Sequence, residues 1–159
     1  MNNLKFEPCL IETPIGHHYR GLAAAGEVSA VIVLRGGAAF ETALRRIIPD
    51  CKAGRLLIQS NSSTAEPELH YLQLPSGIEQ HERVLLMDSQ MSSGGSALMA
   101  VQVLVDHGVA QNKIVFVTYT ACKAGLHRLT TVFPDIVVVM CEMLPEVEPR
   151  WVENRYFRC

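Results

Sequence analysis

Hydroxyl and glycine residues gather behind an apolar segment in the middle of the chain. The run 83–87 (RVLLM) predicts a core strand, and Asp88 follows it directly. The stretch then comprises Asp88, Ser89, Gln90, Met91, Ser92, Ser93, Gly94, Gly95 and Ser96. Glycines let backbone N–H groups approach an anion closely, and the start of a helix favours negative charge. The sequence therefore predicts a phosphate-binding loop between a strand and a helix at Asp88–Ser96.

The carboxylate of Asp88 would repel a phosphate, so it needs another partner, either a pair of ribose hydroxyls or a metal ion. The segment matches neither common nucleotide loop, because it lacks the Lys of a Walker loop and the three spaced glycines of a dinucleotide fingerprint. A simpler alternative is a helix capped by Ser92 or Ser93 after a turn. The clustering of glycine and serine behind a strand-terminal aspartate favours phosphate binding.

A second polar segment, Arg35-Gly36-Gly37, follows the run 28–34 (VSAVIVL). That nearly continuous β-branched run is typical of a strand buried on both faces. A tight turn with a surface arginine is one interpretation of Arg35–Gly37, and an anion-binding loop is the other. Ligands of open parallel sheets bind beyond the carboxyl ends of the strands. We therefore expect both loops to flank one crevice that holds a ligand with phosphates at two ends.

Strands and helices alternate along most of the chain. Strands are expected at 9–13, 28–34, 55–59, 69–74, 83–87, 114–120 and 136–140. Helices are expected at 38–48, from Ser92 or Ser93 to about 107, and at 124–133, with Gly108 as the left-handed residue after the second helix. This order predicts an α/β fold with a doubly wound parallel sheet.

The composition is typical of one globular domain. The chain has 159 residues, of which 48% are hydrophobic and 19% charged, and its formal net charge is −2. This balance argues against a nucleic-acid or membrane partner. No apolar run is long enough for a signal peptide or a membrane span. The five cysteines lack C-x-x-C spacing, which indicates reduced thiols in a cytoplasmic protein.

Several stretches resemble the uracil phosphoribosyltransferase family. VLLMDSQMSSGGSALMAVQVLVDHGV resembles its strand, phosphoribosyl-diphosphate loop and helix, and VIVLRGGAAFETALRRIIP resembles its pyrophosphate-loop segment. GRLLIQSNSSTAEPELHYLQLP is similar to its flexible-loop hairpin, especially in eukaryotic members and in the domain fused to uridine kinases. EMLPEVEPRWVENRYF resembles the C-terminus of animal homologues. The phosphate loop is the most specific part of the resemblance.

The resemblance implies a type I phosphoribosyltransferase-like fold with a small β-hairpin extension. It also implies pyrimidine salvage, in which uracil and phosphoribosyl diphosphate give UMP and pyrophosphate. By position, residues 92–96 would bind the 5′-phosphate, Asp88 the ribose hydroxyls, and Arg35 with Gly36 the pyrophosphate. Ser89, Gln90 and Met91 complete the expected binding loop, and Asp88 and Arg35 are the expected catalytic residues. Magnesium would be carried by the substrate pyrophosphate rather than by a metal site of the protein, and GTP is a candidate activator.

Three departures from the family's pattern support an alternative function. Active members of the family have an arginine at the position of Ser60. They also have a glycine-rich segment that recognises uracil at the position of Glu148-Pro149-Arg150-Trp151. The family's helical N-terminal segment is absent, so we expect residues 1–159 to form a single domain without it. The alternative is a catalytically weak or inactive nucleotide-binding module that acts as a sensor or pairs with an active paralogue or a uridine kinase. We also expect a homo-oligomer and little formation of UMP.

Overall fold

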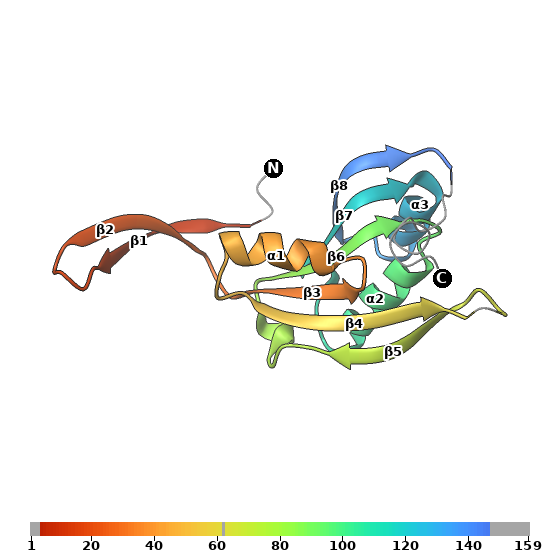
Figure 1. Ribbon diagram of the computed structural model, residues 1–159, viewed down its shortest axis with the longest axis horizontal. Helices are drawn as coiled ribbons and strands as arrows, with labels where there is room; N and C mark the ends of the chain where they lie inside the picture. The colour runs from red at the N-terminus through yellow and green to blue at the C-terminus, as the bar shows by residue number, and fades with distance from the viewer. Residues whose placement is uncertain (1–3, 62, 147–159) are drawn as a thin grey trace.

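A six-stranded sheet forms the core of the computed structural model, which describes residues 4–61 and 63–146 (Figure 1). Its strands are β3 (Val28–Leu34), β4 (Lys52–Ser60), β5 (Pro67–Gln73), β6 (Arg83–Met91), β7 (Ile114–Cys122) and β8 (Val137–Leu144). They lie in the order β5-β4-β3-β6-β7-β8, and neighbours are parallel except for the antiparallel pair β4 and β5. The predicted α/β fold with a mainly parallel sheet is confirmed.

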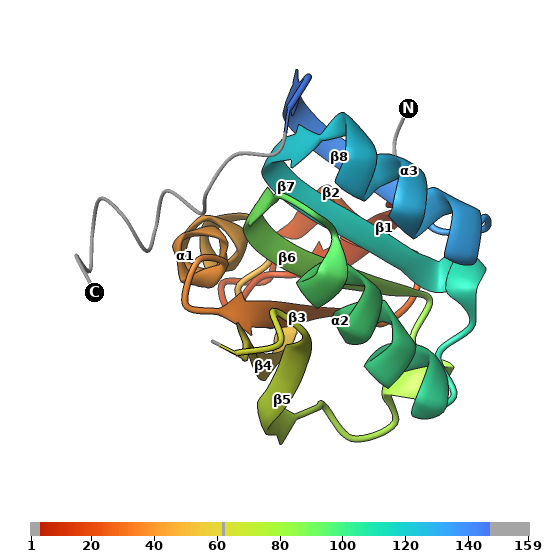
Figure 2. The same ribbon diagram turned by 90° about the vertical axis from the view of Figure 1, so that its right-hand side faces the viewer.

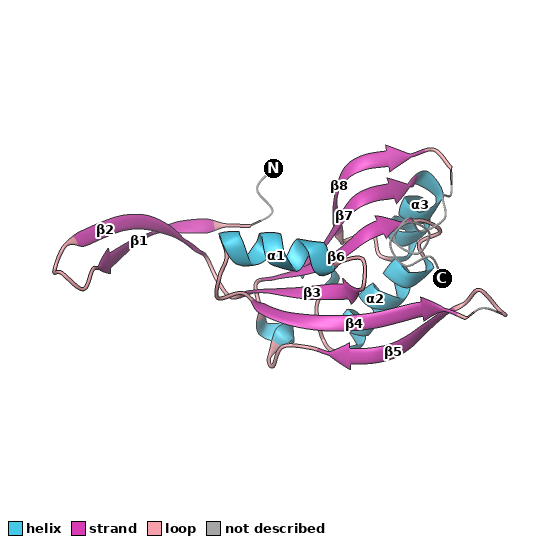
Figure 3. Cartoon of the chain, in the orientation of Figure 1, coloured by secondary structure: helices cyan, strands magenta, loops and turns pink. Residues whose placement is uncertain are grey.

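Helices cover both faces of the sheet. One face carries α1 (Ala38–Ile47), and the other carries α2 (Gly95–Asp106) and α3 (Lys123–Val132), as Figure 2 and Figure 3 show. Successive strand residues point to opposite faces, so Leu85 packs with Leu44 of α1 while Leu86 and Phe116 pack beneath α2 and α3. Two short 3₁₀ helices, η1 (Ile78–Gln80) and η2 (Gln111–Lys113), complete the described elements. None of the described helices has the length and apolar character needed to cross a membrane.

An antiparallel hairpin, here called the arm, projects from the body at the end where β3 and β4 begin (Figure 1). It consists of β1 (Phe6–Glu12) and β2 (His18–Ala24). The hairpin extension is thus present, and the strand expected at 9–13 overlaps β1 at residues 9–12. The sequence did not predict β2, because its residues HYRGLAA are mostly exposed and no buried face imposes an apolar alternation on them.

The order of the strands reverses between β3 and β6. From β3 the chain runs outward to β4 and β5, and it then returns to the other side of β3 for β6, β7 and β8. In open α/β sheets, such a reversal separates the loops that follow two neighbouring strands and creates the usual ligand position. The two polar loops expected from the sequence follow β3 and β6, the strands on either side of this reversal.

Two local expectations were wrong at the start of α2. The strand β6 does not end at 87 but continues to Met91, because Gln90 and Met91 still pair with Thr120 and Ala121 of β7. Tertiary pairing thus overrides the polar character of these residues. The helix begins at Gly95, after Gly94 rather than after a serine cap. The expected left-handed glycine at the other end of α2 is confirmed, since Gly108 has φ 84°.

Candidate functional site

The structure brings the two predicted loops, residues 35–37 and 88–96, into contact; we call them the switch-point loops. A Cβ added to Gly36 would lie 2.3 Å from Oγ of Ser89 and 3.1 Å from Oδ1 of Asp88. A Cβ added to Gly37 would lie 2.3 Å from the carbonyl oxygen of Met87. Glycine at both positions therefore allows the loop after β3 to touch the end of β6, which brings the backbone of Arg35 beside this strand.

Polar side chains at the end of β6 are almost completely buried. Asp88, Ser89 and Gln90 are 2%, 5% and 3% exposed. The Oδ1 atom of Asp88 accepts a hydrogen bond of 2.7 Å from the backbone N–H of Ser89. A buried carboxylate is stable only when it is hydrogen-bonded or paired, so this bond helps to hold Asp88 between the switch-point loops. Met91 packs in the core with 2% exposure, so only its backbone is available to a ligand.

The residues after Met91 form a tight turn that leads into α2. Gly94 has φ 85°, a conformation that side chains rarely adopt, and its carbonyl accepts the first helical bond from Leu98 N–H at 2.9 Å. Ser93 is exposed, and Gly95 and Ser96 are half-buried. Because the first N–H groups of a helix lack partners within the helix, this turn presents backbone donors at the positive end of α2. The arrangement suits an anion.

Helix α3 packs directly against this turn. A Cβ on Gly125 would lie 2.2 Å from the carbonyl oxygen of Ser92, and a Cβ on Gly94 would lie 2.9 Å from the carbonyl oxygen of Gly125. In addition, Nη1 of Arg128 donates a hydrogen bond of 2.9 Å to the carbonyl oxygen of Ser93. Neither Gly125 nor Arg128 was predicted from the sequence as a site residue. The only signal was a glycine in the first turn of a predicted helix.

The end of the β4–β5 hairpin borders the same turn. Ser60 pairs with Pro67 at this end, and a Cβ on Gly95 would lie 3.8 Å from Cδ of Pro67. Asn61 closes the hairpin, since its Oδ1 accepts hydrogen bonds from the N–H groups of Ser63 at 2.8 Å and of a neighbouring residue. The hairpin that carries Ser60 therefore ends close to the start of α2. The segment 148–151 lies outside the described residues.

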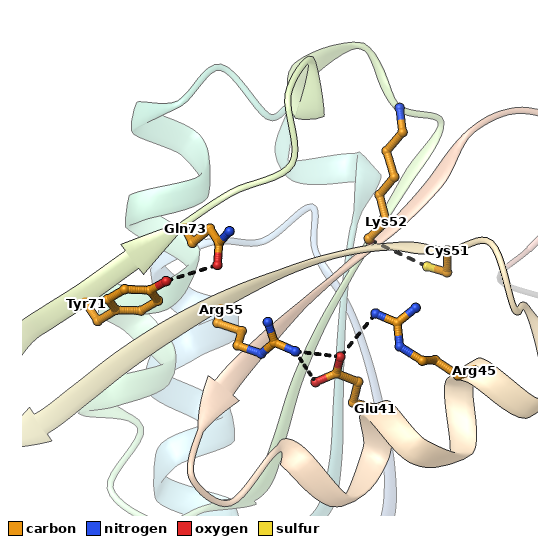
Figure 4. Close-up of polar contacts among 7 residues, drawn as sticks. All are labelled: Glu41, Arg45, Cys51, Lys52, Arg55, Tyr71 and Gln73. Carbon is orange, nitrogen blue, oxygen red and sulfur yellow. Dashed lines mark hydrogen bonds and ion pairs between the residues drawn. The ribbon is translucent and has the colours of Figure 1, made fainter.

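A charged network fixes α1 behind the first switch-point loop (Figure 4). Nη2 of Arg55, on β4, lies 2.8 Å and 3.1 Å from the two carboxylate oxygens of Glu41. Arg45 adds a contact of 3.2 Å from the next turn of α1. Glu41 is mostly buried, with a side chain 17% exposed. Since α1 begins directly after Gly37, this network restrains the helix that follows Arg35-Gly36-Gly37.

The side chains at the site do not form a metal cage. Within residues 4–61 and 63–146 no group of three or more His, Cys, Asp or Glu side chains could hold an ion. Asp88 is the carboxylate at the switch-point loops. Magnesium usually keeps several waters and binds through one or two carboxylates together with substrate phosphates. Asp88 could therefore supply one carboxylate ligand to such an ion.

Curated relatives match most of this chain. It is 41% identical to uridine-cytidine kinase-like 1 of Mus musculus over 137 residues, which are 86% of this chain and 25% of that protein. It is 36% identical to the uracil phosphoribosyltransferase of Dictyostelium discoideum over 140 residues, which are 88% of this chain and 64% of that enzyme. The chain thus spans about a quarter of the first relative and less than two thirds of the second.

Solved structures share the fold. A protein from Aquifex aeolicus superposes with a TM-score of 0.77 at 23% identity, over 92% of this chain and 68% of that chain. A purine phosphoribosyltransferase from Pyrococcus horikoshii gives a TM-score of 0.53 at 17% identity, over 79% and 83% of the two chains. The fold is therefore that of type I phosphoribosyltransferases. The sequence model described as uracil phosphoribosyltransferase matches residues 1–152, and the chain belongs to the uracil phosphoribosyltransferase family.

Proposed function

We propose that the switch-point loops bind a phosphoribosyl compound, either phosphoribosyl diphosphate or UMP. The observation that carries this proposal is the turn at Gly94, which starts α2 without a side-chain cap. The loop that ends in this turn touches the loop after β3 at Asp88 and Ser89. Membership of the uracil phosphoribosyltransferase family supports the same ligand class. An anion at the positive end of a helix gains from both the donors and the helix dipole.

Each part of the ligand has a partner in this proposal. The 5′-phosphate would bind the N–H groups of residues 93–96, and the ribose hydroxyls would bind Asp88. Arg35 and the backbone of Gly36 would bind the diphosphate, where a guanidinium is well suited to phosphate oxygens. Magnesium carried by the diphosphate would supply charge neutralisation as pyrophosphate leaves. Asp88 is already bonded to Ser89 N–H, so its orientation is set before the ribose arrives.

Transfer of the phosphoribosyl group to uracil is the second candidate, and we propose that it is weak or absent. The family supports a glycosyltransferase-type enzyme. However, Ser60 stands where active members present an arginine, so a cation that would act on the departing pyrophosphate is missing. This residue lies in the hairpin that borders the start of α2. Losing one such stabilising group typically costs a few kcal/mol of barrier. These observations favour a module that binds nucleotide as a sensor or as a partner subunit.

Calorimetry separates the candidates. We expect saturable binding of phosphoribosyl diphosphate in the presence of magnesium, and saturable binding of UMP. Radiolabelled uracil with phosphoribosyl diphosphate should then give little UMP, with Asp88→Ala as the blank. Turnover near one per second, within the ordinary enzyme range, would restore the transferase as the function. Absence of any binding would refute the phosphoribosyl site itself.

We also propose self-association through the arm. Several large apolar side chains are exposed there, among them Ile15 at 79% and Leu22 at 70%. A two-stranded hairpin is barely stable alone in water, and exposed apolar patches commonly mark interfaces. Light scattering should give a mass above the 17.6 kDa of one chain. If the protein is a monomer even at high concentration, self-association is refuted, and pairing with an active paralogue or a uridine kinase becomes the proposal for its partner. We further propose that GTP activates the protein and that it is cytoplasmic.

A further inference from the structure

We infer that Arg128 of α3 is a positioning residue of the phosphate site, which holds the turn 92–94 in its anion-binding conformation. This inference deepens the proposed function and rests on it. Arg128 is separated from the turn by more than thirty residues, yet its Nη1 donates to the carbonyl oxygen of Ser93 at 2.9 Å. The bond fixes the peptide unit whose other end is the N–H of Gly94.

The geometry of α3 explains why this arginine reaches the turn. Gly125 and Arg128 are three residues apart and therefore share one face of the helix. The missing side chain of Gly125 lets the helix approach Ser92, where a Cβ would be 2.2 Å from the carbonyl oxygen. Helical side chains lean toward the N-terminus of their own helix, so Arg128 extends back over Gly125 toward the turn.

The chemistry suits an anion site. In a trans peptide the C=O and the N–H point in opposite directions. The bond from Arg128 to the carbonyl of Ser93 therefore also fixes the direction of the N–H of Gly94, which points away from Arg128. Among the described residues, Ser93 is the one hydrogen-bond acceptor of Arg128, whereas a guanidinium has five N–H donors. The positive charge of Arg128 lies on the carbonyl side of this peptide, next to Ser93. Arg128 thus orients the backbone and raises the local potential for an anion.

Two variants of this residue test the inference. Arg128→Met keeps an apolar stem but removes the donor and the charge, and Arg128→Lys keeps the charge and one flexible donor. Arg46→Met is the matched control, because Arg46 is an exposed residue in the last turn of α1. This variant removes the same charge at a position away from residues 92–94. Hydrogen exchange of the ligand-free protein reports the turn itself, and calorimetry with phosphoribosyl diphosphate reports the site.

We expect faster amide exchange at Gly94 and Gly95 in Arg128→Met, and about fivefold weaker binding, as for one charge-assisted hydrogen bond at an exposed position. Arg128→Lys should recover most of the affinity, and Arg46→Met should match the parent in both measurements. Parent-like exchange and affinity in Arg128→Met would overturn the inference, as would an equal loss in Arg46→Met. If the parent binds no phosphoribosyl compound, the proposed function fails, while faster exchange in Arg128→Met would still establish the positioning contact.

Discussion

Replacing Gly94 by alanine should weaken phosphoribosyl binding at least tenfold in a chain that still folds. Gly94 has φ 85°, and a side chain in this left-handed region costs about 1–2 kcal/mol. The added Cβ would also lie 2.9 Å from the carbonyl oxygen and 3.0 Å from Cα of Gly125. Both are backbone atoms that no rotamer change can move. Either the turn or α3 must shift, and the N–H groups that meet the phosphate shift with the turn.

Gly77→Ala is the matched control for the backbone cost. Gly77 has φ 71°, and a Cβ there would meet nothing within 4 Å. Both variants should therefore lose about 1–2 kcal/mol of unfolding free energy from the left-handed conformation, which corresponds to a fall in melting temperature of a few degrees for a domain of this size. Only Gly94→Ala carries the additional contact with Gly125. The difference between the two variants isolates the geometry of the turn.

Calorimetry with phosphoribosyl diphosphate measures the effect on the site, and far-ultraviolet circular dichroism checks that the fold is intact. We expect Gly77→Ala to bind like the parent and Gly94→Ala to bind at least tenfold more weakly, equivalent to about 1.4 kcal/mol. Equal affinities in the parent and Gly94→Ala would refute the reasoning that this turn holds the phosphate.

Three further changes have defined outcomes. Asp88→Asn should weaken phosphoribosyl binding by about 1.5–3 kcal/mol in calorimetry, because charge-assisted acceptance is lost, whereas inorganic phosphate should bind as well or better. Glu41→Gln should lower the free energy of unfolding in denaturant by about 1 kcal/mol, a figure discounted because its partner Arg55 is 40% exposed; an unchanged midpoint would contradict this. The hydrogen bond from Lys52 lowers the pKa of Glu27 below its ordinary value of 4.5, so this pair stabilises the fold above that pH and loses its effect as the pH falls through the lowered pKa. Acid titration of the unfolding midpoint should therefore be shallower in Glu27→Gln than in the parent.

The sequence was most informative where burial dictates the residues. The strand Val28–Leu34 was predicted to the residue, because a strand buried on both faces must be apolar at nearly every position. The alternation of strands and helices then predicted the doubly wound sheet. It did not predict β2, since an exposed hairpin carries no such constraint. Nor did it predict the extension of β6 through Asp88, Ser89 and Gln90, which depends on pairing with β7.

The residue types of the candidate site could be predicted from the sequence, but the contacts that hold these residues together could not. A cluster of glycine and serine behind a strand indicated the turn before α2, and the doubly wound order indicated that Arg35 and Asp88 would lie near each other. The helix begins at Gly95 because Gly94 adopts a left-handed φ. A local sequence pattern does not show whether such a glycine or a serine cap precedes the helix. The contacts of Gly125 and Arg128 join segments more than thirty residues apart. No local pattern encodes such a contact.

We propose that the turn before α2 holds the phosphate of a phosphoribosyl ligand. The most direct measurement is a titration of the isotopically labelled protein with UMP and with phosphoribosyl diphosphate and magnesium, followed by the amide signals of residues 93–96. We expect saturable shifts at these amides with one binding constant for each ligand, and at least tenfold weaker binding in Gly94→Ala. Unmoved amides at residues 93–96 in the parent at millimolar ligand, or saturable shifts confined to other parts of the chain, would contradict it.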